Sequence, residues 1–477
     1  MSNARGAANR WIVAAAVGAA ALILSAQLLV PPVQGLADNG DYQRVMGYAG
    51  FDHSTDVYAE RYFSFLRTAY RVRPIGFVRN GYLSSETLLA LAARFASPAA
   101  WRGGLFDIRT LAAAHIALLL LALGFGVAAC RDLAVPAQCV AAALSVFFFT
   151  DVGYAGPFNS FYSQTASLLF LLLLASVAAT AIRRGRLDGG LLAAYFLAAA
   201  LFVASKPQEA VQAPVLALLG LRLSGFRLAG GWKKPAVALS LALCVFALWY
   251  GRRTPRTLQA AALYQVLFYE TLPHSPSPGA DMTELGLDPA WIRYSGTDAF
   301  QPDTPLEDAA FRERFLASTG YGRIARFYLA HPGRLAERVR RASPKIWSLR
   351  PSYGNLEASP RFPTRTLTAR FAAWSRLRLA VFSAFPITAV ALLLAGNAAF
   401  ALLTWRRAVA RGRLLREGIL AAAVLSATAF GVCLLTNAPP DFSRVFYVAE
   451  ASCDLLLIVD AGWIVQSLAG RPSAGAA

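Results

Sequence analysis

The chain has 477 residues, of which 56% are apolar and only 15% are charged. A soluble protein carries about a quarter charged residues, so this composition excludes an ordinary soluble globular protein and indicates an integral membrane protein. The net charge of +19 does not indicate nucleic-acid binding, because much of it borders apolar segments and no basic stretch is combined with aromatic stacking residues on a soluble domain.

Three uncharged segments are each long enough to cross the roughly 30 Å hydrocarbon core, which takes about 20 residues in a helix. The first of them exceeds the apolar core of a signal peptide and no clear small-x-small cleavage site follows it, so we interpret it as a retained span. Seven weaker candidates bring the prediction to an all-α polytopic protein with about ten transmembrane helices. The strong segments are 11–30, 110–129 and 164–182, and the weaker ones are 134–149, 187–205, 210–228, 235–250, 379–405, 418–436 and 445–466.

The basic residues predict the orientation of these spans. If both termini and the short loops between paired spans lie on one side, that side holds 16 of the 46 Lys and Arg residues and only three acids. Short loops rich in Lys and Arg stay in the cytoplasm, so we expect both termini there. The hairpin 187–228 is either spanning or re-entrant, and basic flanks keep both of its ends on one side in either case.

This orientation divides the chain into three parts. Residues 1–250 form an N-terminal transmembrane module whose first outside loop, 31–109, carries the candidate catalytic residues. Residues 251–378 form a large mixed extracytoplasmic loop, and residues 379–477 form the C-terminal transmembrane helices.

The first outside loop contains two carboxylates three residues apart, Asp38 and Asp41, across an Asn-Gly pair. Asp, Asn and Gly are common turn residues, so a structural turn is one interpretation. Carboxylates just above the bilayer are also suited to act as a base or as metal ligands. Further along, Ser85 is the expected N-cap of a short amphipathic helix that lies in the membrane interface, with Leu88 and Phe95 on its apolar face.

Two shorter outside loops carry polar groups next to aromatic residues. In the first, Asn159, Tyr162 and Gln164 exceed what an aromatic interfacial belt requires. The second places Asp441 and Arg444 before a span that contains Glu450 and Asp454. Acids inside a membrane are costly and usually face a polar cavity or pair with a cation. We expect Lys206 and Glu209 at the hairpin tip to be their partners, and mutual ion pairing for structure is the alternative.

The large loop is the one part of the chain with a soluble-like composition. Its second half predicts helices at 311–317, 323–329 and 335–342. Four arginines gather on or directly before the last of these, and they fit either anionic lipid headgroups or a phosphate group, because Arg holds phosphate oxygens with two hydrogen bonds. These residues are Arg334, Arg338, Arg340 and Arg341.

Taken together, the layout resembles the GT-C superfamily of membrane glycosyltransferases, and within it the bacterial hexose transferases of cell-surface glycan assembly. The resemblance is carried by the acidic motif 38–41, the interfacial helices of the first loop, the stretch Phe-Asn-Ser-Phe-Tyr-Ser at 158–163, Lys206-Pro207 at the hairpin tip, and Asp-Phe-Ser-Arg at 441–444. It implies an enzyme of the bacterial inner membrane that uses a polyprenyl-phosphate-linked sugar and a glycan or lipid acceptor on the extracytoplasmic face.

The resemblance also implies roles for residues. Asp41 is the first choice for the general base and Asp38 the second. The donor phosphate is expected to bind Lys206, Arg444, Arg338 and Arg341. The remaining substrate contacts are expected from Asn159, Tyr162, Gln164, Glu209 and Asp441. Some members of the superfamily need a divalent metal such as Mg²⁺ or Mn²⁺ and others do not. If a metal takes part, Asp38 and Asp41 are the expected ligands.

Two other functions remain open from the sequence. An oligosaccharide polymerase or ligase also combines many spans with one large outside loop, and its chemistry here would depend on arginines and on His274 and His331. A transporter or flippase would use Glu450, Asp454 and Lys206 along a polar path. Transporters commonly contain inverted repeats, and no such repeat is visible in this chain.

Overall fold

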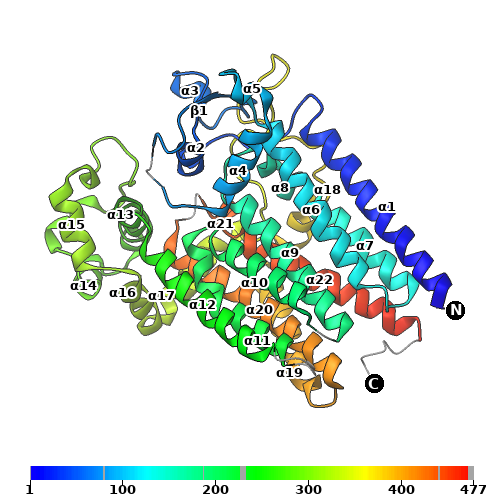
Figure 1. The fold of residues 1–477 in the computed structure, drawn as a ribbon. Coiled ribbons are helices and arrows are strands. Elements are labelled where there is room, and N and C mark those ends of the chain that lie inside the picture. Colours follow the sequence, from blue (N-terminus) through cyan, green and yellow to red (C-terminus); the bar gives the residue numbers. More distant parts are fainter. Residues whose placement is uncertain (1, 79–80, 186, 226–231, 439–440, 471–477) are drawn as a thin grey trace.

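A bundle of long apolar helices forms the body of the molecule in a computed structural model (Figure 1), which describes all residues except 1, 79–80, 186, 226–231, 439–440 and 471–477. Six helices in the described residues are long and apolar enough to span a membrane, or seven if a pair bent by 53° counts as one span. The expected count of ten is therefore not confirmed. The six helices are α1 (Ser2–Leu28), α6 (Arg109–Ala129), α9 (Gln164–Arg184), α12 (Lys233–Arg252), α19 (Pro386–Trp405) and α20 (Ala410–Thr436), and the bent pair is α7 (Val135–Phe149) with α8 (Val152–Ala155) and η1 (Gly156–Asn159).

The other expected spans do not count among these candidate membrane spans, for two reasons. Helices α10 (Gly189–Val203) and α11 (Ala213–Ser224) flank the short helix η2 (Pro207–Gln212), and 15 residues of α-helix extend only about 22 Å. The expected end of this hairpin at position 228 lies outside the described residues. Helix α22 (Tyr447–Leu468) is long enough to span, but it carries Glu450, Asp454 and Asp460.

The segment expected at 379–405 is two helices, α18 (Ala373–Phe382) and α19. Pro386 starts α19, because proline has no amide hydrogen to donate and favours the first turn of a helix. The break at 383–385 allows α18 to carry the fully buried Arg378 inward against α22.

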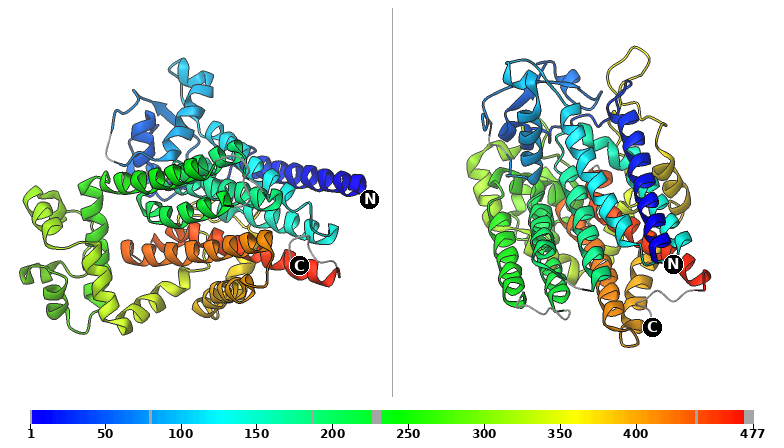
Figure 2. Two further views of the ribbon diagram at one scale, coloured as in Figure 1. Left: turned by 60° about the horizontal axis from the view of Figure 1, so that its bottom comes forward. Right: turned by 45° about the vertical axis from the view of Figure 1, so that its right-hand side comes forward.

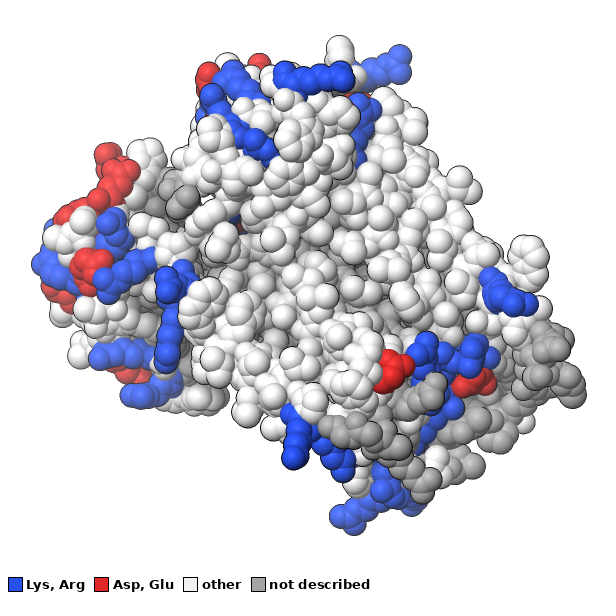
Figure 3. Space-filling model, viewed as in Figure 1, with Lys and Arg blue, Asp and Glu red and all other residues white. Residues whose placement is uncertain are grey.

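The bundle is ordered around α9, whose residues are mostly buried and which packs against α6 and α10. The first helix is part of this bundle, since α1 packs along α6 and α7 and the Asn9 side chain donates a hydrogen bond to Gln138 at 3.1 Å. Helix α22 packs between α7 and α20. The face of the bundle shown in Figure 3 is almost free of charge, and Lys and Arg gather at its edges, as expected for a surface in contact with lipid.

The first outside loop folds into a small layer of its own. Three short antiparallel strands pair in the order β1 (Phe51–His53), β2 (Ala69–Val72) and β3 (Phe106–Asp107), with Phe51 opposite Val72 and Tyr70 opposite Phe106. Four helices accompany the sheet: α2 (Gln43–Ala49), α3 (Tyr58–Arg61), α4 (Ser85–Ala96) and α5 (Pro98–Trp101).

Helix α4 has the exposure pattern of an interfacial helix. Its N-cap is Ser84 and not Ser85, because the Ser84 hydroxyl accepts the amide hydrogen of Glu86. Leu88 and Phe95 are exposed although they are apolar, while the carboxyl of Glu86 is buried against the protein. A helix that turns its polar residues inward and its apolar residues outward is suited to contact lipid.

The large loop folds into helices around a separate apolar core. The three expected helices are confirmed as α15 (Ala309–Ser318), α16 (Tyr321–Ala330) and α17 (Pro332–Ala342). All named strands of the described chain lie in the first loop, so the large loop is not the mixed structure that was expected. The remaining helices of this loop are α13 (Arg256–Tyr264), η3 (Gln265–Thr271), η4 (Leu272–His274), α14 (Pro278–Glu284), η5 (Pro289–Tyr294), η6 (Pro305–Glu307) and η7 (Ser343–Lys345).

An extended segment joins the two outside loops. After α17 the chain returns over the first loop, where Leu356 pairs with Gln34 and Glu357 pairs with Leu66 as isolated β-bridges. The amide of Ala37 also donates to the carbonyl of Gly354 at 2.7 Å. Both large loops therefore lie at one end of the bundle, and Figure 2 shows the two termini at the other end.

This arrangement agrees with the predicted grouping of the loops but does not say which end faces the cytoplasm. We expect the termini to be cytoplasmic, because short loops rich in Lys and Arg are retained there. Reporter fusions at Asp281 and at Ala477 test this orientation. A reporter active only outside the cytoplasm should be active at Asp281 and silent at Ala477, and the opposite pattern would contradict the proposed location of the site.

Candidate functional site

The site begins at a tight turn formed by the motif 38–41 of the first loop. The Asp38 carboxylate accepts the amide hydrogens of Gly40 at 2.7 Å and Tyr42 at 3.1 Å, and the Asn39 side chain accepts that of Asp41 at 3.2 Å. Gly40 has a φ of +103°, which favours glycine. The turn therefore uses Asp38 and Asn39 for its own hydrogen bonds and places Asp41 just before α2.

Asp38 and Asp41 point to different surroundings. The second carboxylate oxygen of Asp38 lies 3.1 Å from Nε2 of His53 on β1, and both side chains are buried. Burial raises the pKa of Asp38, and the contact with His53 opposes this effect. Asp38 therefore has the structural role that the turn interpretation predicts: it supports the loop and does not line the pocket.

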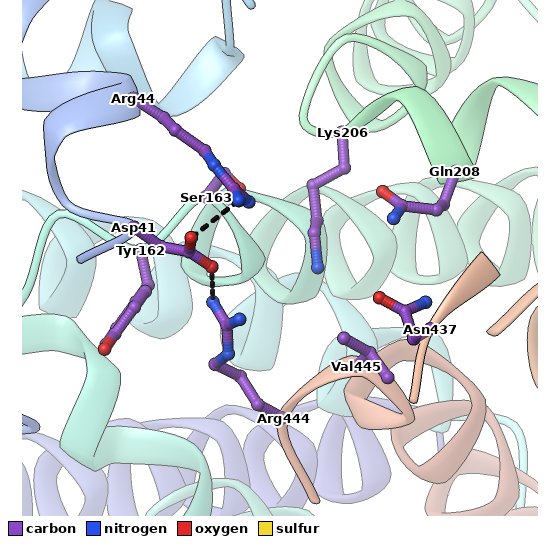
Figure 4. A pocket seen from close by; sticks show the side chains of 9 residues that line it. All are labelled: Asp41, Arg44, Tyr162, Ser163, Lys206, Gln208, Asn437, Arg444 and Val445. Carbon is purple, nitrogen blue, oxygen red and sulfur yellow. Dashed lines mark ion pairs between the residues drawn. The ribbon is translucent and has the colours of Figure 1, made fainter. Parts of the chain in front are cut away.

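Asp41 is held between two arginines (Figure 4). Its Oδ1 lies 2.6 Å from Nη2 of Arg44 on α2, and its Oδ2 forms an ion pair with Nη1 of Arg444. Arg444 belongs to α21 (Phe442–Val445), the short helix before α22. The guanidinium of Arg444 also pairs with Asp441 at 3.2 Å and lies over the ring of Tyr162, 5.1 Å from its centroid. One carboxylate thus joins the first loop to the start of the last helix.

A pocket of about 320 Å³, counted with its open mouth, lies at this junction. It brings together the first loop, the start of α9, the hairpin tip and the segment before α22. Its polar groups converge on a small space in Figure 4, and charged atoms are visible in a hollow between the two outside loops and the bundle in Figure 3. The lining residues are Asp41, Arg44, Tyr162, Ser163, Lys206, Gln208, Asn437, Arg444 and Val445.

Lys206 supplies the third cation of the pocket. Its side chain is only 7% exposed and its nitrogen points into the pocket between Asp41 and Asn437 (Figure 4). Within the described ranges of the chain, no ion pair or hydrogen bond engages its ammonium group. An ammonium on a nearly buried side chain without an ion-pair partner is costly, and an anion in the pocket would offset this cost.

The electrostatics of the pocket favour a charged carboxylate. Burial alone would raise the pKa of Asp41, but Arg44, Arg444 and Lys206 outweigh burial and hold that pKa below its usual value. Burial works against the charged form of Arg444, yet Asp41 and the neighbouring phenol and carboxyl groups raise the pKa of Arg444. Burial and then Arg444 lower the pKa of Lys206. An additional negative charge would therefore stabilise Lys206 in its protonated form.

The structure brings together only some of the predicted substrate contacts. Tyr162 lines the pocket, and its hydroxyl accepts the amide hydrogen of Asn39 at 2.9 Å. Asn159 lies behind the first loop, where its amide donates to the carbonyls of Leu28 and Gln34. The buried residues Gln164 and Glu209 do not line the pocket.

The predicted arginines of the large loop do not reach the pocket. Arg338 is fully buried, and its guanidinium donates to the carbonyls of Leu434 at 2.7 Å and Asn437 at 2.9 Å. Arg341 pairs with the buried Glu270 at 2.9 Å. Because α17 packs with this face inward, Arg341 links two segments of the large loop and Arg338 links the loop to α20. They are structural residues in this arrangement and are not placed to bind the donor phosphate.

Five pocket residues were not predicted as site residues: Arg44, Ser163, Gln208, Asn437 and Val445. Arg44 had a local signal, because it follows Asp41 by three residues at the start of a helix, a spacing at which side chains meet. Ser163 and Gln208 lie beside the predicted Tyr162 and Lys206. Asn437 precedes the motif 441–444 by only four residues, so each of these residues belongs to a segment that was identified.

The acids of the last helix have a different partner from the one expected. Asp454 accepts hydrogen bonds from Arg378 at 2.9 Å, from Tyr154 at 2.7 Å and from Trp374 at 2.9 Å. Glu450 lies 3.8 Å from the same arginine. The expected pairing with Lys206 or Glu209 is therefore wrong. Asp454 instead forms a structural ion pair with Arg378.

A divalent metal does not fit the two acids of the first loop as they lie. Within residues that the structure describes, no group of three or more His, Cys, Asp or Glu side chains is arranged to hold a metal ion. The Asp38 oxygens face backbone amides and His53, and the Asp41 oxygens face guanidinium groups.

Comparison with protein families gives a match over nearly the whole chain. Residues 3–473 match the family model described as the YfdI N-terminal transmembrane domain. No curated protein and no solved structure matches the chain. The family and the apolar helices together identify an integral membrane protein.

Breaking the buried Arg378 pair should strongly destabilise the bundle. Arg378→Ala leaves Asp454 charged and buried without a cation, which typically costs about 3–5 kcal/mol. Thermal unfolding in detergent measures the effect. Arg376→Ala is the matched control, since Arg376 is an exposed arginine on the same helix and should change the midpoint little. Equal midpoints for the two variants would contradict a stabilising role for this pair.

Proposed function

The chain belongs to the YfdI N-terminal transmembrane domain family, and from this membership and the pocket we propose that it is a membrane glycosyltransferase. The reaction moves a hexose from a polyprenyl-phosphate donor to a glycan or lipid acceptor on the extracytoplasmic face of the membrane. One observation carries the proposal: a carboxylate lies among three cations, Arg44, Lys206 and Arg444, in a pocket at one end of an apolar helix bundle.

The pocket contains the two kinds of group that this reaction needs. The acceptor hydroxyl must lose a proton as it attacks the anomeric carbon, and Asp41 is the carboxylate placed to receive this proton. The bond from the anomeric carbon to the phosphate oxygen breaks, and its electron pair stays on that oxygen. The phosphate therefore gains a second negative charge, which Lys206 and the two arginines stabilise. The acceptor oxygen forms the new bond to the anomeric carbon.

The location of the pocket suits a donor whose carrier is embedded in lipid. The apolar side of α4, with Leu88 and Phe95 exposed, supports a position of the first loop at the membrane interface. Lys206 lies at the tip of the hairpin, and Arg444 lies directly before α22. Cations at this level meet a phosphate group while the polyprenyl chain remains in the hydrocarbon region.

The two other functions have less support from the arrangement. The histidines of the polymerase or ligase hypothesis are in the large loop, where His331 pairs with Glu284 at 2.8 Å and His274 contacts the carbonyl of Glu270, and neither lines the pocket. For transport, the acids of α22 would have to line a path. Asp454 is instead fixed by three hydrogen bonds.

Replacing the base tests the proposed chemistry. We expect Asp41→Asn to reduce sugar transfer by about 10²–10⁴-fold, the usual contribution of a general base. Transfer of labelled hexose from polyprenyl-phosphate hexose by the purified protein measures the rate. Asp56→Asn is the matched control, because Asp56 is an exposed carboxylate of the same loop and its loss should leave the rate unchanged. Near-normal transfer by Asp41→Asn would contradict the assignment.

The donor-binding role of Arg444 gives a separate prediction. Arg444→Ala should weaken binding of the polyprenyl-phosphate sugar by about 10–100-fold, because a hydrogen bond to a charged group is lost. Arg444→Lys should restore only part of the affinity, since an ammonium group replaces a planar guanidinium. Titration of the donor against protein in nanodiscs measures both, with the exposed Arg340→Ala as control. Equal affinity in all variants would remove Arg444 from the donor site.

A further inference from the structure

The contacts of Asp41 resemble those that a phosphate group would make. Two guanidinium groups from different segments, Arg44 on α2 and Arg444 on α21, approach the two oxygens of one carboxylate. Arginine binds carboxylate and phosphate oxygens with the same geometry. The carboxylate of Asp41 therefore occupies contacts that an oxyanion could use.

The pocket also contains more hydrogen-bond donors than Asp41 uses. Nε of Arg444 is buried and has no hydrogen-bond partner in the described part of the chain. The ammonium of Lys206 points into the same space, which Gln208 also lines (Figure 4). Ser163 and Asn437 line it too, but their side chains already have hydrogen-bond partners. A carboxylate has two oxygens, whereas a phosphate group has more oxygens to accept from these donors. The unused donors therefore indicate a larger anion than Asp41.

We propose that Asp41 and the phosphate of the donor compete for the same arginines, so that arrival of the donor releases Asp41 to act as the base. This inference rests on the proposed function and adds a regulation of its site. At rest Asp41 balances the cations of the pocket. In the donor complex the phosphate takes over Arg44, Arg444 and Lys206, and the Asp41 carboxylate becomes free to accept a hydrogen bond from the acceptor hydroxyl.

The exchange conserves charge through the reaction. Asp41 and the phosphodiester of the donor each carry one negative charge before transfer. When the acceptor proton moves to Asp41, the leaving phosphate gains the charge that Asp41 loses. The total charge facing the three cations is the same before and after the step, so no compensating ion has to enter or leave the pocket.

The released carboxylate should also be more basic. The lowering of its pKa at rest comes from nearby cations, and burial acts in the opposite direction. A phosphate that neutralises these cations leaves burial as the larger influence, so the pKa of Asp41 rises in the donor complex. The described titratable groups near Asp41 are Arg44, Tyr82, Tyr162, Lys206, Tyr353, Asp441 and Arg444.

Binding of polyprenyl phosphate, which carries no sugar, tests the competition directly. Asp41→Asn removes the competing charge while keeping the size of the side chain, so this variant should bind polyprenyl phosphate about tenfold more tightly than the wild type or better. Asp441→Asn is the matched control: Asp441 also pairs with Arg444 but does not line the pocket and is more exposed, so the affinity should change much less. Titrations are made in nanodiscs at pH 8, where the phosphate is fully ionised.

The outcomes separate this inference from the proposed function. If Asp41→Asn loses sugar transfer but binds polyprenyl phosphate no more tightly than the wild type, the competition is refuted and the function stands. If tighter binding is found but the wild type transfers no sugar, the competition stands and the function is refuted. Absence of polyprenyl phosphate binding in the wild type and in both variants would refute both.

The wild-type protein provides a second measurement that does not depend on a variant folding. The acid limb of kcat/KM reports the base in the free protein, and the acid limb of kcat reports it in the donor complex. Because the pKa of Asp41 is low at rest and rises when the phosphate binds, the limb of kcat should lie at higher pH than that of kcat/KM. Coincident limbs would refute the release of Asp41.

Discussion

The ion pair between Asp41 and Arg444 is the contact on which the site depends. It joins the first outside loop to the start of the last helix, and Lys206 approaches the same point from the hairpin tip. None of these segments forms a pocket alone. The extended segment at 353–357 supports the junction, because it pairs with the first loop on both of its sides and fixes where that loop lies over the bundle.

A second charged cluster, inside the bundle, determines where Arg444 can lie. Arg378 enters from α18 and meets Asp454 on α22, with Trp347 and Trp374 packed near the guanidinium. A charge pair in an apolar region tolerates little displacement, since separation leaves each ion without compensation. The depth of α22 is therefore fixed, and with it the position of α21. In this way a contact inside the bundle supports the pocket at one end of the bundle.

The sequence predicted what depends on local pattern and missed what depends on packing. Apolar runs identified the six helices that are long and apolar enough to span a membrane in the described chain, although ten spans were expected. Turn residues identified the loop of Asp41. The local sequence does not determine which face of a helix is buried. From the sequence, all four arginines of α17 fit a phosphate site equally well. In the structure, α17 packs with Arg338 inward, so Arg338 is buried and donates to a backbone carbonyl. The partner of Asp454 was missed for the same reason. Arg378 was assigned to an outside loop, but the break before Pro386 directs α18 toward the bundle, where Arg378 contacts Asp454.

The proposed competition explains why one residue both balances the pocket and serves as its base. Three cations close together repel one another, so a site ready for a phosphate group is unstable unless another anion is present. Asp41 supplies this anion at rest, and its carboxylate is then unavailable for proton transfer. The base becomes available only when the donor phosphate has taken its place. A single ion-pair exchange thus couples donor binding to activation of the acceptor, without requiring a separate moving element.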